Sequence, residues 1–289
     1  MSKFSVVVTT YNQEFEKICI TLDSILAQTL ADKEIVIADD GSRIEYLKEL
    51  SGYLRDKGFS KFLTVKNKVN VGTVKNALSG LEAASGDYAM LLSPGDLFAD
   101  ERILERIHAF LLDRKAKLAS GVIRRYARDD SGRIFTADYY LGSVEQLKQE
   151  PDSLLEQQLV YNRWASGGSL FFDRGYFVKF LKDLSDRYNV RYCEDLVAPL
   201  ITLNGGQMEA FEEQIIWYEW GVGISNSGGI GNVRRMYKDY RNFYDGILQD
   251  FRSNSVVRRA YRKFRAKEMI TKCPPLYLSL RKLLGLVGR

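Results

Sequence analysis

The first 113 residues alternate between short apolar segments rich in β-branched residues and longer segments whose apolar residues recur at helical spacing. The short segments are residues 4–10, 34–40, 61–67 and 87–93, and the longer ones are residues 15–26, 44–57, 73–84 and 101–113. Repeated strand-then-helix units require a parallel sheet, because each helix crosses one face of the sheet and returns the chain to the next strand. The sequence therefore predicts an α/β, Rossmann-like fold with three layers and a mostly parallel sheet. In such sheets the ligand lies outside the carboxyl ends of the strands.

The pattern after residue 113 is less regular. It predicts strands over residues 117–127 and 168–172, a turn at residues 130–132, and helices over residues 143–159 and 194–203. The glycine-rich residues 221–231 are typical of a mobile loop that could act as a lid over a site.

Length and composition exclude several classes of protein. A chain of 289 residues with 45% hydrophobic residues can bury a full core. Its apolar runs are far shorter than the ~18 residues that a membrane-spanning helix needs, and no signal-peptide pattern begins the sequence. We therefore expect a cytoplasmic protein. The cysteines, Cys19, Cys193 and Cys273, are odd in number and far apart, so we expect them to be reduced and structural.

The positive charge is concentrated in the C-terminal tail. Residues 251–289 contain eleven Lys or Arg and a single acid, Glu268, which leaves residues 1–250 with a net charge of −5 out of the total of +5. This distribution argues against nucleic-acid binding by the main part of the chain. Apolar residues alternate with the basic ones in the tail, which suits a helical extension on an anionic membrane surface. A helix packed on the main domain and a dimerisation arm remain alternatives.

Polar residues follow each of the four predicted strands, and parallel strands bring them to one edge of the sheet. Such an edge can bind a nucleotide through an aromatic ring that stacks on the base, carboxylates that accept hydrogen bonds from the base or ribose, and small residues near the phosphates. The residues are Thr9, Tyr11 and Asn12 at the end of the first strand, Asp39 and Asp40 at the end of the second, Asn70 and Gly72 after the third, and Ser93 and Asp96 at the end of the fourth.

The ordered segments that carry these residues resemble the signature of family 2 glycosyltransferases with the GT-A fold. They are residues 5–12 (SVVVTTYN), 34–42 (EIVIADDGS), 70–78 (NVGTVKNAL), 86–96 (GDYAMLLSPGD) and the pair Glu194-Asp195. The resemblance implies a catalytic domain over residues 1–225, with a nucleotide-binding half (1–98) and an acceptor-side half (99–225). Residues 226–289 then form a glycine-rich loop and a basic helical extension.

The resemblance also implies an activity: inverting transfer of a sugar from a nucleotide diphosphate sugar, most often a UDP-sugar, to a glycan, lipid-linked or glycoprotein acceptor. It assigns Asp195 as the general base with Glu194 in support, and Asp96 as the ligand of Mn²⁺ or Mg²⁺. It places Trp164, Gly167 and Gly168 on the acceptor side. The expected donor-binding residues are Thr9, Tyr11, Asn12, Asp39, Asp40, Asn70, Gly72, Lys75, Asn76, Ser93 and Asp96.

One motif departs from the family pattern. The family usually has Asp-x-Asp-Asp, whereas this chain has Ser93-Pro94-Gly95-Asp96, so two carboxylates are absent. We expect weaker contacts to the ribose and the sugar. A catalytically silent, nucleotide-binding or partner subunit with the same fold is therefore the alternative function.

Simpler interpretations remain for several residues. Asp96 could only form a turn, Asp195 could only stabilise the start of a helix, and Trp164 could be a packing residue. We expect His108 to be structural. A dinucleotide-dependent oxidoreductase is disfavoured because no G-x-G-x-x-G follows the first strand, and a nucleotidyltransferase because no glycine-rich basic loop does.

Overall fold

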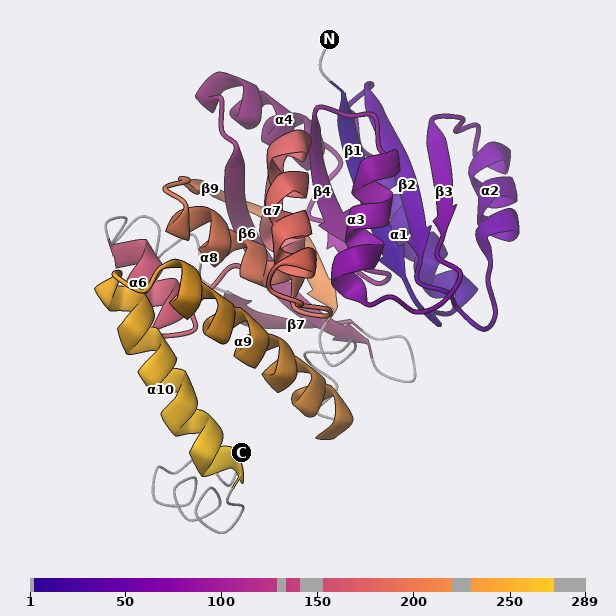
Figure 1. Ribbon diagram of the computed structural model, residues 1–289. Helices are drawn as coiled ribbons and strands as arrows, with labels where there is room; N and C mark the ends of the chain where they lie inside the picture. Colours follow the sequence, from indigo (N-terminus) through magenta and orange to yellow (C-terminus); the bar gives the residue numbers. More distant parts are fainter. Residues whose placement is uncertain (1–2, 129–133, 141–152, 220–229, 273–289) are drawn as a thin grey trace.

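The computed structural model describes residues 3–128, 134–140, 153–219 and 230–272 (Figure 1). Its first half is the predicted parallel sheet with crossover helices. The elements are β1 (Phe4–Thr10), α1 (Phe15–Leu26), β2 (Lys33–Asp39), α2 (Leu47–Asp56), β3 (Phe62–Lys66), α3 (Thr73–Ala83) and β4 (Tyr88–Leu92). The strands pair in the order β3-β2-β1-β4, and all three pairings are parallel. The prediction from the sequence pattern is confirmed here.

The second half adds antiparallel strands to the same sheet. Its strand order continues from β4 through β8, β6 and β9 to β5, with β7 beside β6. Only β6 and β9 are parallel; β8, β7 and β5 pair antiparallel with their neighbours. The elements are β5 (Leu97–Phe98), α4 (Ile103–Arg114), β6 (Leu118–Arg128), β7 (Ile134–Tyr140), α6 (Leu154–Leu159), the 3-10 turn η2 (Gly167–Ser169), β8 (Leu170–Asp173), α7 (Arg174–Asp186), the 3-10 turn η3 (Glu194–Leu196), α8 (Val197–Leu203) and β9 (Glu209–Glu219).

Several second-half predictions need correction. The predicted strand at residues 168–172 begins as the η2 turn, and the predicted helix at 194–203 begins as the η3 turn. Helix α7 and strands β5, β7 and β9 were not predicted. The turn at 130–132 and residues 143–152 of the predicted helix lie outside the described residues, which show only α6 at its end.

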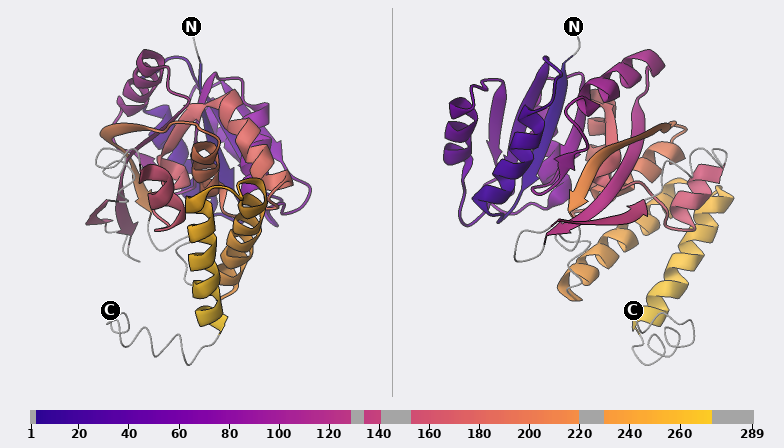
Figure 2. Two further views of the ribbon diagram at one scale, coloured as in Figure 1. Left: turned by 60° about the vertical axis from the view of Figure 1, so that its left-hand side comes forward. Right: turned by 180° about the vertical axis from the view of Figure 1, so that it is seen from behind.

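Alternating residues of the central strands feed two cores, one on each face of the sheet. In β1, Val6 and Val8 point into the core formed with α1, α2 and α4, whereas Val7 points into the core formed with α3, α7 and α8. Figure 2 shows the two helical layers from behind and from the side. The sheet between them is the predicted middle layer, and its carboxyl edge is left open for a ligand.

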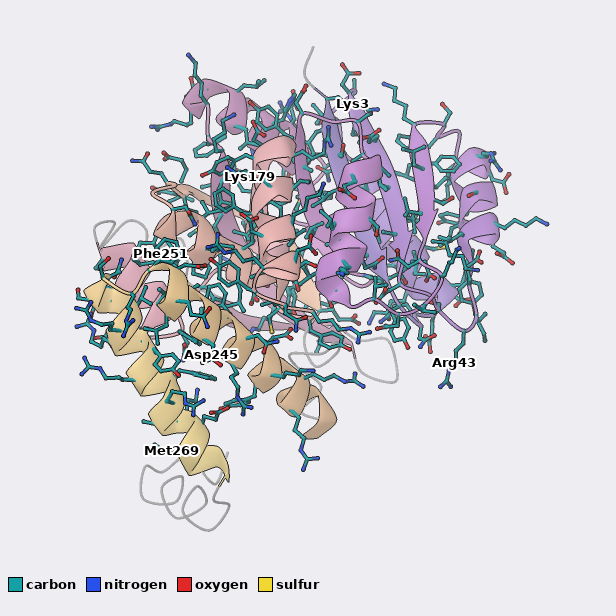
Figure 3. All side chains as sticks on the ribbon, in the orientation of Figure 1. Lys3, Arg43, Lys179, Asp245, Phe251 and Met269 are labelled. Atoms are coloured by element: carbon teal, nitrogen blue, oxygen red, sulfur yellow. The ribbon has the colours of Figure 1, made fainter. Side chains whose placement is uncertain are left out.

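Two long helices follow the sheet and pack on the core that β1 forms with α3, α7 and α8. They are α9 (Ile230–Asp250) and α10 (Ser255–Lys272), which contact each other, and α10 also contacts α6. Phe243 and Tyr244 of α9 and Val257 and Phe264 of α10 are buried in that core. Figure 3 draws the side chains at this junction, where Asp245 is labelled on α9.

The structure bears on two predictions about this region. The predicted glycine-rich loop falls largely on residues outside the described part, and α9 already begins at Ile230. Across the described residues, no helix has both the length and the apolar character to cross a bilayer. The division of the chain at residue 225 remains a prediction.

Candidate active-site cleft

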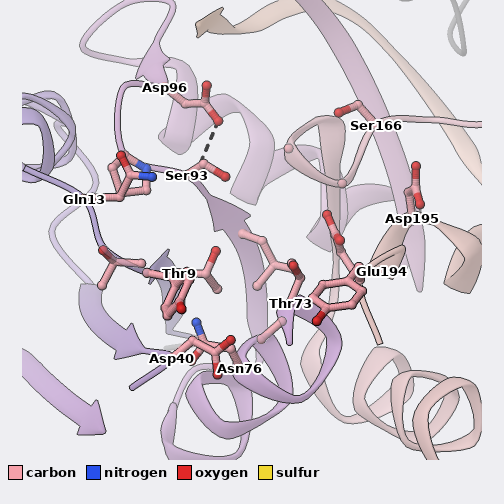
Figure 4. A pocket seen from close by; sticks show the side chains of 18 of the residues that line it. Thr9, Gln13, Asp40, Thr73, Asn76, Ser93, Asp96, Ser166, Glu194 and Asp195 are labelled. Atoms are coloured by element: carbon pink, nitrogen blue, oxygen red, sulfur yellow. Dashed lines mark hydrogen bonds between the residues drawn. The ribbon is translucent and has the colours of Figure 1, made fainter. Parts of the chain in front are cut away.

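A cleft of about 440 Å³ opens at the carboxyl edge of the parallel strands (Figure 4). It collects residues from β1, α1, α3, β4, η2, η3, β9 and α9. Ten of the residues predicted for the site line it: Thr9, Tyr11, Asp40, Asn76, Ser93, Asp96, Gly167, Gly168, Glu194 and Asp195. Segments that are almost two hundred residues apart in the sequence thus meet around one cavity.

The side of the cleft next to β2 is built around Asp40. Its carboxylate is 3% exposed and accepts hydrogen bonds from the backbone N–H groups of Val71 (2.7 Å) and Gly72 (2.9 Å). Burial raises the pKa of Asp40, and these two hydrogen bonds oppose the rise. Asn76 donates to the Ala38 carbonyl at 3.0 Å, which fixes the start of α3 against β2. Asp40 therefore organises the loop before α3, and Tyr11, 43% exposed, also lines the cleft.

Six predicted site residues lie near the cleft without lining it. Asp39 caps the turn after β2 by accepting from Ser42 N (2.9 Å) and Ser42 Oγ (2.5 Å). The other five have other surroundings: Asn12 accepts from Arg43 N (2.9 Å), Asn70 accepts from Arg191, Gly72 bonds to Asp40, Lys75 is exposed, and Trp164 packs against Tyr240. Their binding roles remain predictions.

Asp96 lies on the opposite side of the cleft, 3% exposed, at the end of the motif that departs from the family pattern. Its Oδ2 accepts from Ser93 N at 3.3 Å and its Oδ1 accepts from Glu219 N at 3.1 Å. Burial raises the pKa of Asp96 to about 7, and the nearby Glu219 carboxylate adds to the rise. A carboxylate held in this way is costly to ionise without a positive partner.

Glu219, the last residue of β9, occupies the space next to Gly95. A Cβ atom added to Gly95 would lie 2.1 Å from Glu219 Oε2, and Gly95 has a positive φ of 101°. Both facts require glycine at this position. The Glu219 carboxylate of β9 thus occupies the space where a side chain at position 95, the third position of the family motif, would begin. Lys17 Nζ lies 2.5 Å from Glu219 Oε2 and balances its charge.

Glu194 and Asp195 form the third side of the cleft, on the η3 turn before α8. Burial raises the pKa of both carboxyl groups, and the charge of Asp195 adds to the rise for Glu194. The Trp164 side chain hydrogen bonds to the Asp195 carboxylate, which lowers the pKa of Asp195 and so opposes the effect of burial. Its indole N–H must be the donor, because tryptophan has no other polar side-chain atom.

A buried aspartate from α9 holds the segment that leads into this turn. Asp239 Oδ2 accepts from the backbone N–H groups of Arg191 (3.1 Å), Tyr192 (2.5 Å) and Cys193 (3.2 Å), and Asp239 is 3% exposed. A carboxylate that binds successive N–H groups fills an anion-binding concavity in the backbone. Asp239 therefore fixes the position of Glu194 and Asp195 from outside the sheet.

Two glycines separate the Asp96 and Glu194 sides of the cleft. A Cβ on Gly168 would lie 3.7 Å from Asp96 Oδ2, and a Cβ on Gly167 would lie 2.6 Å from Glu194 Oε1. Gly167 thus allows Glu194 to approach the backbone of η2. Neither glycine places a side chain between the two carboxylates.

Sequence reasoning missed Lys17, Glu219 and Asp239. The nearest sequence signal to Glu219 is the glycine-rich stretch at residues 221–231, and it assigns no role to this residue. Asp239 had none, because its hydrogen-bond partners lie 46–48 residues away in the sequence.

His108 and Cys19 lie outside the cleft, whereas Cys193 lines it. The His108 ring packs edge-on between Phe4 (6.0 Å) and Tyr88 (5.8 Å), in keeping with a structural role. Cys19 and Cys193 are buried and free of disulfides. Cys273 lies outside the described residues.

Curated relatives match a limited part of the chain. Polypeptide N-acetylgalactosaminyltransferase 11 of Xenopus tropicalis is 33% identical over 91 residues, which are 30% of this chain and 15% of that protein. An inactive polypeptide N-acetylgalactosaminyltransferase-like protein 5 of Macaca fascicularis is 31% identical over 90 residues, or 30% of this chain and 20% of that protein. The chain therefore spans at most a fifth of the length of these relatives.

Solved structures and a family model match more of it. S. aureus TarS 1-349 in complex with UDP-GlcNAc superposes with a TM-score of 0.57 at 16% identity, covering 85% of this chain and 66% of that one. A crystal structure of S. aureus TarS gives a TM-score of 0.54 at 17% identity, covering 85% and 40%. These likenesses establish the fold. The model of glycosyl transferase family 2 matches residues 5–166, more than half of the chain, and the protein therefore belongs to glycosyl transferase family 2.

Proposed function

We propose that this protein transfers a sugar from a UDP-sugar to an acceptor hydroxyl with inversion at the anomeric carbon. The observation that carries the proposal is the arrangement of carboxylates: Asp96 and Asp195 face one cleft from different sides, with Asp40 on a third side. An inverting transfer needs this separation, because the leaving group departs from one face of the sugar while the acceptor attacks the other.

Asp195 acts as the general base. Its carboxylate takes the proton of the acceptor hydroxyl as that oxygen bonds to the anomeric carbon, and the breaking bond leaves its electron pair on the departing diphosphate. The Trp164 hydrogen bond holds one side of the carboxylate, and the Asp239 contacts hold the backbone before it. The elevated pKa of Asp195 suits a base that must accept a proton near neutral pH.

The residues on the Asp96 side fit a divalent cation. Mg²⁺ and Mn²⁺ prefer oxygen ligands and are often held by one or two carboxylates plus substrate phosphates. Among the described residues no group of three His, Cys, Asp or Glu forms a complete metal cage, so Asp96 and Glu219 would hold the ion together with the donor diphosphate. When bound, the ion neutralises charge on the leaving diphosphate.

The donor proposal draws on the solved relative. S. aureus TarS has been crystallised with UDP and with UDP-GlcNAc, which favours uridine nucleotides here. Asp40, Thr9 and Tyr11 then contact the base and ribose. The acceptor is a glycan, a lipid-linked sugar or a glycoprotein.

Nucleotide release from a panel of UDP- and GDP-sugars with Mn²⁺ tests the proposal. We expect Asp195→Asn to reduce turnover by about 10²- to 10⁴-fold while UDP binding persists, since the base acts on the acceptor. Asp96→Ala should weaken Mn²⁺-dependent UDP binding. Asp100→Asn, half-exposed and paired with Arg106, is the control and should change neither. Proton NMR of the released sugar should show the inverted anomer first. Full activity in both Asp195→Asn and Asp96→Ala would refute the assignments.

A catalytically silent subunit is the second candidate, because Ser93 and Gly95 replace two family carboxylates. In that case the wild-type chain binds UDP but releases none from any donor. A cytoplasmic location, membrane contact by the basic tail and a homodimer also remain proposals, which sedimentation with anionic vesicles and analytical ultracentrifugation can test.

A further inference from the structure

A second cavity, of about 710 Å³, lies between α6, the segment that follows it, and helices α9 and α10. It shares no lining residue with the active-site cleft. We call it the helical pocket. It is lined by Leu159, Val160, Tyr161, Asn162, Trp164, Tyr237, Tyr240, Tyr244, Ala260, Lys263, Phe264, Ala266 and Lys267.

The helical pocket differs in charge from the cleft. Its lining contains six aromatic rings and two lysines, with no acidic residue. The cleft is lined by five carboxylates and one lysine, Lys17. The cleft therefore needs a cation before it can accept a diphosphate, whereas the helical pocket can attract an anion directly.

The two lysines of the helical pocket have no acidic partner among the described residues. Two acids on these helices pair with arginines instead: Glu268 with Arg241 and Arg265, and Glu156 with Arg259. Lys263 Nζ instead lies 4.7 Å from the centroid of the Tyr161 ring, which is 48% exposed. Arg163 Cζ lies 5.7 Å from the same centroid, so two cationic side chains contact this ring. Cationic groups around a half-exposed aromatic side chain are suited to bind a charged sugar, because they pair with its anionic groups.

One wall separates the helical pocket from the catalytic base. The Trp164 ring lines the pocket and lies 5.6 Å from the Tyr240 ring, while the Trp164 side chain hydrogen bonds to Asp195 in the cleft. On α9, Met236 lines the cleft and the next residue, Tyr237, lines the helical pocket. The helical pocket therefore lies directly behind the side chain that contacts Asp195, next to the acceptor side of the cleft.

We propose that the helical pocket binds an anionic segment of the acceptor, a glycan with phosphate or carboxylate groups, with its rings against Tyr161 and Tyr237 and its charges on Lys263 and Lys267. This inference deepens the proposed function and rests on it for the identity of the acceptor. Aromatic lining explains affinity for sugar rings, and the lysines explain selection of a charged chain over a neutral one.

The test measures binding of fluorescein-labelled tetragalacturonate to the full chain by fluorescence anisotropy at low salt, with labelled maltotetraose as the neutral probe. Lys263→Gln with Lys267→Gln removes both pocket charges. Arg252→Gln with Arg262→Gln removes two exposed charges that do not line the pocket, so it is the charge-matched control. Tyr161→Ala removes a half-exposed ring of the pocket without disturbing the buried core.

We expect the wild type to prefer tetragalacturonate, the lysine variant to bind it about tenfold more weakly, and Tyr161→Ala to weaken both probes. The control should change binding by less than about twofold. Equal losses in the two charge-matched variants, or no binding by the wild type, would overturn the proposal. So would lysine-dependent binding of anionic vesicles without binding of the oligosaccharide, which would indicate a membrane surface. Failure of the wild type to bind UDP with Mn²⁺ would count against the proposed function alone.

Discussion

Replacing Asp96 by Asn should stabilise the metal-free protein while removing its response to metal. The wild-type carboxyl has a pKa raised from 3.8 to about 7 by burial, so ionising it in the folded chain costs free energy. A rise from 3.8 to about 7 corresponds to about 4 kcal/mol at a pH above both values. The asparagine loses the hydrogen bond from Ser93 N, worth about 1 kcal/mol. The net expectation at pH 8 is a gain of about 3 kcal/mol.

The sign of the pH dependence follows from the direction of the shift. Because the pKa of Asp96 is higher in the folded state, the wild type has its full stability below about pH 4 and loses it as the pH rises through about 7. Relative to the wild type, Asp96→Asn should therefore be about 1 kcal/mol less stable at pH 4, gain stability between pH 4 and pH 7, and stay about 3 kcal/mol more stable above.

Urea denaturation in EDTA at pH 4, 6 and 8 measures this difference. Asp100→Asn is the matched control with the opposite sign, because the Arg106 ion pair lowers the pKa of Asp100. In a second series, measured by thermal denaturation, Mn²⁺ and UDP should raise the melting temperature of the wild type and leave the melting temperature of Asp96→Asn unchanged. An Asp96→Asn chain that is less stable than the wild type at pH 8 in EDTA, or equally more stable at every pH, would refute the reasoning.

Three further substitutions test the frame of the site, each by urea denaturation. Glu34→Gln should lower the free energy of unfolding by about 3 kcal/mol at pH 7, because hydrogen bonds lower the pKa of Glu34 to about 2. This loss should shrink as the pH falls from 4.5 through 2, and a loss that does not depend on pH would contradict the argument. Asp239→Ala should cost about 3 kcal/mol and reduce kcat for donor hydrolysis, since three backbone N–H groups lose their acceptor; unchanged kcat would argue against a positioning role. Gly72→Ala should cost about 3 kcal/mol, because φ is 93° and the new Cβ would lie 2.3 Å from Arg191 Cγ. Gly52→Ala is its control, because no atom lies within 4 Å of the new Cβ, and it should raise the free energy of unfolding by at most about 1 kcal/mol. Equal effects of the two substitutions would refute the steric argument.

The first half of the fold was predictable because its signals are local. Each strand there is a short apolar run, each helix has its own periodicity, and the handedness rule for crossovers leaves little freedom in how they assemble. The predicted bounds differ from those observed by at most about three residues, as in α2, which was expected at 44–57 and spans Leu47–Asp56.

The second half depends on signals that were weaker or absent from the local sequence. Helix α7 was readable in principle: Phe177, Phe180, Leu181 and Leu184 recur at helical spacing after Asp173, whose side chain caps the helix by accepting from Tyr176 N at 2.9 Å. Strand β9 was not, because its central acidic residues are exposed and it is a strand only through pairing with β6 and β5.

The same distinction applies to the site. Asp40, Asp96 and Asp195 could be found because they follow recognisable strands or lie in a family segment. Glu219 could not be placed, since its contact with Asp96 joins residues 123 positions apart. The sequence showed the loss of a carboxylate at Gly95 but not that β9 brings another one beside it.

The C-terminal helices therefore participate in the site, beyond any role as a tail. Helix α9 supplies Met236 to the cleft and Asp239 to the segment before the base, and α10 supports α9 through the stacking of Phe264 on Tyr244 at 4.8 Å. A chain stopped after Asp250 would expose the buried side of α9 and would disturb Asp195 through Asp239. Loss of vesicle binding in such a truncation would thus mix membrane affinity with damage to the fold. Substitution of exposed charges on α10 separates the two effects, because it leaves the packed face of the helix intact.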